Sequence, residues 1–370
     1  MKAAIVLQEI SYQYSIIERR SLLRESVKAA TASQEVAMRT SIRVIQAVGV
    51  LLLVFGLTVV SVPAAEIESS NYGTTTNGMP FAVAMAKGFF KAAGADITGV
   101  RGSEGGGTTI RNMLGGNMPY GEVALSAAVL AIQGGADLKI ISHNVYTVAE
   151  FNWLTKPDSS IRTLKDLKGK RIGFTNPQST SQALDYLLLE AAGLKDTDVQ
   201  LIKTGGFGAG LTAVAHDGID IMPIADPLWT LNQGRFRAVF WAPDVLPPLC
   251  NIVAIATGRA MKETPDLIRA IITGRRKAVE FMQTNPDESA QIIAKAYEMD
   301  ATAVRTVLRN LIEKKAPGGL PYWGAGQFKW DSMNNMVRAQ RLVGVVKGEV
   351  DWTKMVDESL LPADLKSEKR

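Results

Sequence analysis

The sequence predicts an α/β protein of two lobes, in which parallel sheets are joined by a two-segment hinge and the C-terminal part is mostly helical. From residue 67 onward, short strand-like runs alternate with helical segments at the spacing of parallel sheets. Two turn-rich breaks, 157–160 and 243–248, enclose a complete α/β run. A chain of 370 residues that is 46% hydrophobic can fill two cores. We therefore expect lobe I to hold 65–160 and 247–370, and lobe II to hold 161–246.

Each expected element follows from local apolar patterning and from the Gly, Pro and polar residues that bound it. The first strand follows Ile67 and ends within Ser69–Gly73. Further strands are expected at 96–100, 123–125, 138–142, 151–156, 171–174, 199–203, 219–222, 236–241 and 251–257. Helices are expected at 81–93, 109–114, 127–133, 183–192, 210–217, 228–233, 265–285, 286–298, 301–315 and 331–347.

An export signal is predicted over residues 38–64. Arg39 and Arg43 give a positive start, an apolar run occupies 44–60, and small residues precede a cut after Ala64. On this hypothesis Met38 is the true start and residues 1–37 are an unassigned extension. An uncleaved anchor is the alternative, because a run of about 17 residues is at the short limit for spanning a bilayer.

The charge balance gives no nucleic-acid signal. The formal net charge is +5, and residues 1–64 hold seven Lys and Arg against four Asp and Glu, which leaves +2 for the rest. No dense basic patch interleaved with aromatic residues occurs in the sequence. The single cysteine, Cys250, excludes an internal disulfide and a multi-cysteine metal site, and we expect it to be a small buried side chain.

Short polar side chains gather at the expected carboxyl ends of the strands, where parallel α/β sheets bind ligands. The loop 175–182 is the richest of them, and it leads into a helix whose start offers free N–H groups and a positive dipole end. The candidate ligand-binding residues are Thr76, Asn77, Ser103, Glu104, Thr108, Ser126, Asn176, Ser179, Thr180, Asp226 and Trp229. Such a lining suits a small oxyanion or a polar neutral ligand. Helix capping is the alternative role for each Ser, Thr and Asn.

Two of these candidates, Glu104 and Asp226, are acidic. If both face a ligand bound at these strand ends, they repel a simple anion and favour a ligand with an amine group. Glu104 facing solvent and Asp226 capping the helix at 228–233 remain open alternatives. Trp229 and Tyr72 could supply aromatic walls, and Trp323 could overhang the cleft from the Gly/Pro-rich segment 317–326.

Five segments in order resemble the solute-binding proteins of ABC importers for nitrate, taurine and alkanesulfonates, a group with relatives linked to thiamine-pyrimidine precursors. The segments are AKGFFKAAGADI (86–97), GEVALSAA (121–128), LKDLKGKRIGF (164–174), LLLEAAGLKDTDVQLIKTG (187–205) and DGIDIMPIADP (217–227). The resemblance covers roughly 67–360. The run Gly105–Gly107 departs from it, being richer in glycine than expected of a first pocket loop.

The resemblance implies a type II periplasmic-binding-protein fold with a ligand cleft at the hinge that closes on binding. It also implies a periplasmic, monomeric receptor that delivers a small polar ligand to an inner-membrane ABC permease and its ATPase. A sulfonate-, nitrate- or taurine-like oxyanion is the favoured ligand, and an amino-pyrimidine or aromatic compound is the alternative. We expect no catalysis, cofactor, metal or nucleic-acid partner.

A periplasmic enzyme or sensor on the same fold is the alternative of a different class. His143 and His216 lie in no metal or nucleophile motif, and no GxxxxGK[ST] phosphate loop occurs. The segment 208–213 fits the looser GxGxxA dinucleotide pattern, but an export signal argues against a soluble nicotinamide enzyme.

Overall fold

The computed structural model describes residues 19–21, 23–26, 28, 31, 34, 38, 64–116, 118–177, 179–313 and 317–367. These residues belong to two units, Met1–Ser61 and Val62–Arg370. In the first unit, the described positions are helical and exposed. The predicted export signal lies outside the described residues except at its ends, Met38 and Ala64. None of the helices described is both long and apolar enough to cross a bilayer.

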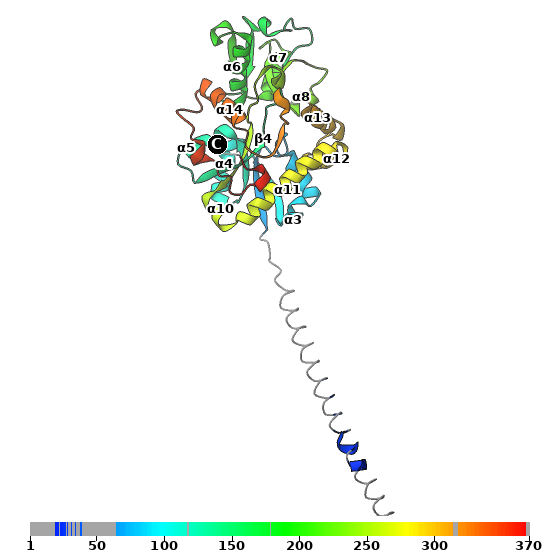
Figure 1. Ribbon diagram of the computed structural model, residues 1–370. Coiled ribbons are helices and arrows are strands. Elements are labelled where there is room, and N and C mark those ends of the chain that lie inside the picture. Colours follow the sequence, from blue (N-terminus) through cyan, green and yellow to red (C-terminus); the bar gives the residue numbers. More distant parts are fainter. Residues whose placement is uncertain are drawn as a thin grey trace, which may run out of the picture. The chain divides into compact units, whose positions relative to one another are not determined.

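A six-stranded mixed sheet forms the centre of the first lobe (Figure 1). Its order is β11 (Trp323–Gly326), β4 (Leu138–Val145), β10 (Ile252–Thr257), β3 (Gly121–Ala124), β1 (Ala65–Ser70) and β2 (Ile97–Ser103). β1 runs parallel to β2 and β3, as predicted, whereas β10 is antiparallel to both β3 and β4. β11, which the sequence did not reveal, is antiparallel to β4. The strands from the later part of the chain, β10 and β11, thus run opposite to the parallel strands that come first.

Helices cover both faces of this sheet. On one side, α2 (Met79–Ala86) and α3 (Phe89–Ala92) pack on α11 (Pro265–Thr284), and α12 (Pro286–Tyr297) packs on α2 and on α13 (Ala301–Glu313). On the other, α4 (Gly105–Gly116) packs on α5 (Leu125–Gln133), which contacts α14 (Trp330–Leu342). Figure 1 shows these two groups on opposite sides of β4. The short helices α10 (Gly258–Glu263) and α15 (Trp352–Met355) complete the lobe.

The described residues of the second lobe include five short strands. β6 (Arg171–Phe174) and β7 (Gln200–Lys203) are parallel, and β5 (Phe151–Thr155) pairs antiparallel with both β8 (Met222–Ala225) and β9 (Arg237–Trp241). A parallel bridge between Ile172 and Ile221 joins the two sets. The helices are α6 (Thr180–Ala192), α7 (Phe207–Ala215), α8 (Leu228–Leu231) and α9 (Ala242–Val245). The lobe boundaries at 160/161 and 246/247 stay a prediction. β5, which lies before the first boundary, pairs with β8 and β9 of the second lobe.

Two local differences from the predicted elements have clear causes. The helix expected over 81–93 is broken, because Gly88 adopts a left-handed conformation (φ 67°) between α2 and α3. The glycine-rich run 105–107 is the first turn of α4 and not a loop. A Cβ atom on Gly106 would lie 2.4 Å from Cβ of Ala127, so glycine allows α4 to approach α5 closely.

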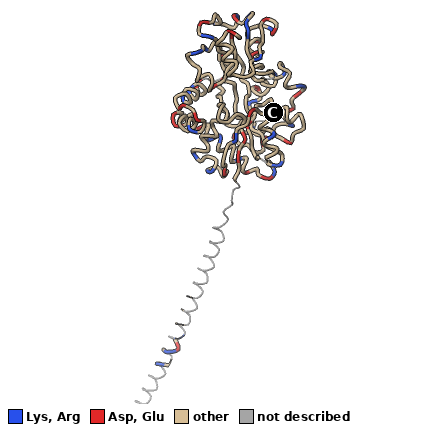
Figure 2. Tube along the Cα trace, turned by 180° about the vertical axis from the view of Figure 1, so that it is seen from behind, with Lys and Arg blue, Asp and Glu red and all other residues tan. Residues whose placement is uncertain are grey.

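A buried ion pair lies inside the first lobe. Arg275 of α11 is 2% exposed and donates from Nε to Oε1 of Glu122 on β3 at 2.7 Å. Its other nitrogens donate to the carbonyls of Asn144 and Gly324 at 2.8 Å each. One side chain thus joins α11 to β3, β4 and β11. Along the Cα trace, acidic and basic residues are interspersed over the described part of the second unit (Figure 2).

Candidate functional site

A cleft of about 250 Å³ lies between the two lobes. Its lining comes from the segments that follow β1, β2, β3, β6 and β8, from the start of α7, from the two chain segments that cross between the lobes, and from Tyr322. The carboxyl ends of the parallel strands therefore meet at one place, because parallel strands bring these ends to the same edge of a sheet. This cleft is the candidate site.

The first-lobe wall is held by the side chains of Thr76 and Tyr322, which are 1% exposed each. Thr76 Oγ1 and the Tyr322 hydroxyl are 2.6 Å apart and hydrogen-bonded. Trp323 donates from Nε1 to the Thr76 carbonyl at 3.1 Å. Next to them, Thr75 donates to Oδ1 of Asn77 at 2.5 Å. The loop after β1 is thus fixed against the segment before β11.

The second-lobe wall is the start of α6. Ser179 caps this 13-residue helix by accepting from the Gln182 N–H at 3.2 Å. The Ser181 hydroxyl lies 2.8 Å from that of Ser179 and 2.9 Å from that of Thr175, and it accepts from the Thr175 N–H at 3.0 Å. These hydroxyls, with the N–H groups of the first helical turn, form a wall rich in hydrogen-bond donors.

Two buried carboxyl groups form the acidic part of the cleft. Glu150, 3% exposed, precedes β5, and its Oε1 accepts from Nδ2 of Asn251. Asp226, 1% exposed, follows β8, and its Oδ1 accepts from the Thr230 hydroxyl at 2.7 Å and the Thr230 N–H at 3.1 Å. The second oxygen of each, Oε2 of Glu150 and Oδ2 of Asp226, is buried with no hydrogen-bond partner. A ligand N–H could satisfy either one.

The environment of both carboxyl groups favours the neutral acid. Burial raises the pKa of Glu150 from 4.5 to about 8; nearby Asp226 adds to this, while Asn251 and Tyr322 oppose it. Burial also raises the pKa of Asp226 from 3.8 to about 6, against the hydrogen bonds from Thr230. Among the described residues that line the cleft there is no Lys, Arg or His. Perturbed acids in a cleft are typical of functional sites.

Two phenylalanines supply an apolar part of the lining. Phe151 begins β5 and Phe207 begins α7, and their ring centroids lie 6.2 Å apart at an angle of 55°. Both rings border the cleft. A flat or apolar portion of a ligand would pack here.

Five of the eleven candidate residues from the sequence line the cleft: Thr76, Asn77, Ser179, Thr180 and Asp226. Of the two open roles for Asp226, the structure shows both, since one carboxyl oxygen contacts α8 while the residue borders the cleft. The residues that the sequence did not single out include Ser70, Glu150, Phe207, Asn251 and Tyr322. Glu150 and Asn251 flank strands at the crossings between the lobes, and that position is the signal by which they could have been found.

The other six candidates lie outside the cleft lining. Ser103 pairs with Thr109 at 2.7 Å, Asn176 donates to the Gly205 carbonyl at 3.2 Å, and Glu104 is exposed. The hydroxyl of Thr108 accepts from Arg111 at 2.9 Å, and Ser126 is half-buried in α5. Short polar residues near strand ends thus serve local turns as well as the cleft.

The expected aromatic walls pack elsewhere. Trp229 is buried against Trp241 with ring centroids 6.1 Å apart, and Tyr72 packs edge-on against Tyr297 at 5.3 Å. Trp323 is buried beneath Thr76, and the neighbouring Tyr322 borders the cleft instead. The large aromatic residues that the sequence singled out thus pack against other residues of the protein and do not line the cleft.

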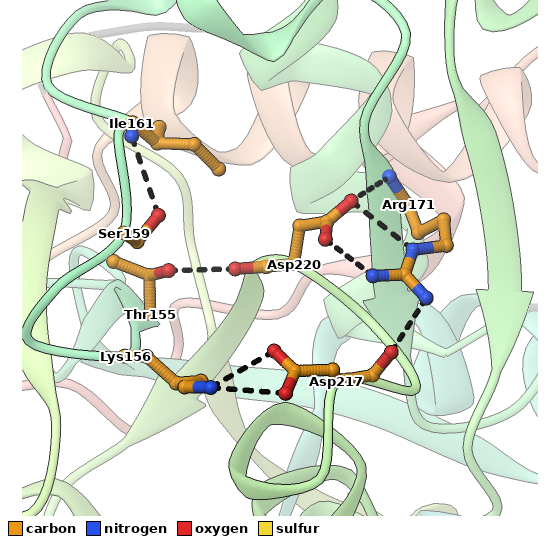
Figure 3. Close-up of polar contacts among 7 residues, drawn as sticks. All are labelled: Thr155, Lys156, Ser159, Ile161, Arg171, Asp217 and Asp220. Atoms are coloured by element: carbon orange, nitrogen blue, oxygen red, sulfur yellow. Dashed lines mark hydrogen bonds and ion pairs between the residues drawn. The ribbon is translucent and has the colours of Figure 1, made fainter.

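A second polar hollow, of about 240 Å³, lies in the second lobe around the starts of β6 and β8. Figure 3 shows its paired charges: Arg171 contacts both carboxyl oxygens of Asp220, and Lys156 contacts both of Asp217 at 3.0 Å. Thr155 donates to the Asp220 carbonyl at 2.7 Å. Because these charges already have partners, we interpret the hollow as a structural network that ties the end of β5 to β6 and β8.

The residues suited to metal binding or nucleophilic chemistry do not gather. His143 is buried in β4, and burial lowers its pKa to about 3. Cys250 is buried, and burial raises the pKa of its thiol. Across the described residues, no group of three or more His, Cys, Asp and Glu could hold a metal ion.

Residues 75–289 match the family model described as NMT1/THI5 like. The chain belongs to this family. A candidate binding protein of Brucella abortus (strain 2308) is 29% identical over 234 residues, which cover 62% of this chain and 70% of the relative.

Two solved structures share the fold. One is the periplasmic aliphatic sulphonate binding protein SsuA of Escherichia coli, with a TM-score of 0.66 and 19% identity over 79% of this chain and 91% of that one. The other is the periplasmic nitrate-binding protein NrtA of Synechocystis PCC 6803, with a TM-score of 0.58 and 15% identity over 81% and 87%. The NMT1/THI5-like chain therefore has the fold of periplasmic solute-binding proteins, and the predicted fold class is confirmed.

Proposed function

We propose that this NMT1/THI5-like protein is an exported, monomeric receptor of an ABC importer. It captures a small ligand in the cleft between its lobes and presents it to an inner-membrane permease and its ATPase. The shared fold supports this function, because the two structural relatives are periplasmic proteins that bind a sulphonate and nitrate. The resemblance of five ordered sequence segments to importer receptors adds to it.

The ligand that we propose carries N–H donors, as an amino-pyrimidine does. The observation that carries this choice is the pair of buried carboxyl oxygens, on Glu150 and Asp226, that lack hydrogen-bond partners. An unsatisfied buried acceptor costs free energy, and an N–H group of the ligand would remove that cost. A simple anion such as nitrate would meet these acceptors with no described Lys, Arg or His in the lining to compensate. The proposal therefore departs from the oxyanion that loop composition favoured.

An amino-pyrimidine fits the apolar part of the cleft as well. Its flat ring would pack against Phe151 and Phe207, which border the cleft. Its ring nitrogens accept hydrogen bonds and would face the hydroxyls of Ser179 and Thr180. The volume of about 250 Å³ suits a small, single-ring compound.

A taurine-like zwitterion is the second candidate, and the start of α6 favours it. A sulfonate group would lie at the hydroxyls and N–H groups of Thr180 and Ser181, where the helix dipole favours negative charge. Its ammonium group would reach Glu150 or Asp226 on the opposite side. The amino-pyrimidine and the taurine-like ligand both carry an N–H donor, but only the amino-pyrimidine has a ring.

Calorimetry and thermal-shift measurements with 4-aminopyrimidine, taurine, ethanesulfonate and nitrate test the proposal. We expect one of the first two to bind and to raise stability by about 2.7 kcal/mol at a hundredfold excess over Kd. Asp226→Asn should weaken that binding, since it removes the charge but keeps an acceptor for Thr230. Glu104→Gln, an exposed acid outside the cleft, is the matched control and should bind normally.

Two results would contradict the proposal. If nitrate or ethanesulfonate binds while both nitrogen compounds fail, the ligand class is wrong. If the bound compound is turned over, the protein is an enzyme and not a receptor.

A further inference from the structure

The side chains of Glu150 and Asn251 join the two segments that cross between the lobes. Glu150 immediately precedes β5 in the first crossing, and Asn251 immediately precedes β10 in the second. Nδ2 of Asn251 donates to Oε1 of Glu150, and both residues border the cleft. The hydrogen bond between them is therefore a direct link between the two crossing segments, in the lining of the candidate site.

The backbones of these two residues are tied to different lobes. The Asn251 carbonyl accepts from the Leu125 N–H at 3.0 Å, and the Asn251 N–H donates to the Val145 carbonyl at 3.1 Å, which fixes it to β4 and the start of α5. The Glu150 carbonyl accepts from the Asp226 N–H at 2.9 Å, which fixes it to the end of β8 in the second lobe. A change in the Glu150–Asn251 contact thus acts between the lobes and not within one of them.

Glu150 borders the cleft, and one of its carboxyl oxygens is buried there without a partner. Oε2 has no hydrogen-bond partner, although Oε1 is engaged by Asn251. The groups around this carboxyl are Asp226, whose charge disfavours ionisation of Glu150, and Asn251 and Tyr322, which favour it. A ligand N–H at Oε2 would favour the carboxylate, and a carboxylate accepts a stronger hydrogen bond from Asn251 than a neutral acid does.

We propose that Glu150 selects ligands with an N–H donor and, through its hydrogen bond to Asn251, couples their capture to closure of the two lobes. This inference rests on the proposed function. When the ligand binds, Glu150 gives its proton to solvent, Oε2 accepts from the ligand, and Oε1 holds Asn251 more tightly. The lobes are then stabilised in the closed arrangement, since the ligand interacts with closed and open states differently.

Three variants test the link. Asn251→Ala removes the hydrogen bond but leaves Oε2 of Glu150 in place, and Glu150→Gln keeps the shape but cannot ionise. Glu104→Gln is the control outside the cleft. The probe is 4-aminopyrimidine or taurine, whichever the wild-type protein binds, and circular dichroism first confirms that each variant is folded. Asn251→Ser replaces Asn251→Ala if the alanine variant does not fold.

Binding is measured by calorimetry from pH 5.5 to pH 9, and closure by the ligand-induced fall in the radius of gyration in small-angle X-ray scattering. Wild-type binding should release a proton at neutral pH. Asn251→Ala should bind about tenfold more weakly or worse and lose most of the fall in radius. Glu150→Gln should bind more weakly and release no proton.

The possible failures are distinguishable. If the wild type binds neither probe, the proposed ligand class fails, and the inference fails with it. If the wild type binds and closes, but Asn251→Ala and Asn251→Ser bind and close equally well, the ligand class stands and only the coupling is overturned. Unchanged proton release in Glu150→Gln would overturn the role of Glu150 in the same way.

Discussion

Replacing Glu150 with glutamine should stabilise the empty protein at alkaline pH. Burial raises the pKa of this carboxyl from 4.5 to about 8. Between these two values the folded state holds a proton that the unfolded state has released, so stability falls as pH rises through the window. The full cost is reached above pH 8 and amounts to about 5 kcal/mol, at 1.36 kcal/mol for each pKa unit.

Glutamine removes this cost because it is never charged, and its carbonyl oxygen still accepts from Asn251. Urea unfolding without ligand should show similar midpoints for the variant and the wild type near pH 5, and a higher midpoint for the variant at pH 9. Glu104→Gln, at an exposed position, should follow the wild type at both pH values. Parallel pH profiles for wild type and Glu150→Gln would refute the reasoning, since they would show that Glu150 is ionised without cost in the folded protein.

Three further substitutions test how the frame of the site is held. Glu122→Gln leaves Arg275, 2% exposed, without its carboxylate and should cost about 3–5 kcal/mol, read as a lower urea midpoint; an unchanged midpoint would argue against the buried ion pair. Gly324→Ala places a Cβ 2.4 Å from the Tyr146 ring and 2.6 Å from the His143 carbonyl oxygen, and it should cost about 1–3 kcal/mol by the same assay; an unchanged midpoint would argue against this close packing. Asp220→Asn weakens the network of Figure 3 and should lower the melting temperature without changing ligand affinity; a loss of affinity would mean that the second hollow takes part in binding.

Local patterning predicted most of the strands and helices but not β11, and it did not give the direction of every strand. The three strands that begin the chain's folded part pair in parallel, as their alternation with helices predicts. β10 enters the same sheet antiparallel, because the chain returns to it from the second lobe. β11 is only four residues long and lies in a Gly- and Pro-rich segment, so no period of two is visible in its sequence.

The cleft was partly predictable for a similar reason. Thr76 and Ser179 follow strands in the sequence, and the rule that ligands lie at the ends of parallel strands selects them. Glu150 lies before a strand, and its sequence neighbours are ordinary. Its burial comes from the return of the chain at Asn251 and from Tyr322, which is more than 170 residues away in the sequence. The position of Glu150 at a crossing between the lobes was visible in the sequence, but its burial depends on this long-range arrangement and was not.

The cost of ionising Glu150 also bears on how a receptor discriminates between ligands. An empty cleft at neutral pH holds a mostly protonated acid, whose pKa is about 8. A ligand that offers an N–H donor recovers hydrogen bonding that the empty protein lacks at Oε2. A ligand that offers only acceptors can receive the single O–H of a neutral Glu150, but it meets the unpaired oxygen of Asp226 without a donor of its own. The unpaired oxygens of Glu150 and Asp226, which lower stability in the empty protein, thus favour ligands that carry N–H donors over ligands that carry only acceptors.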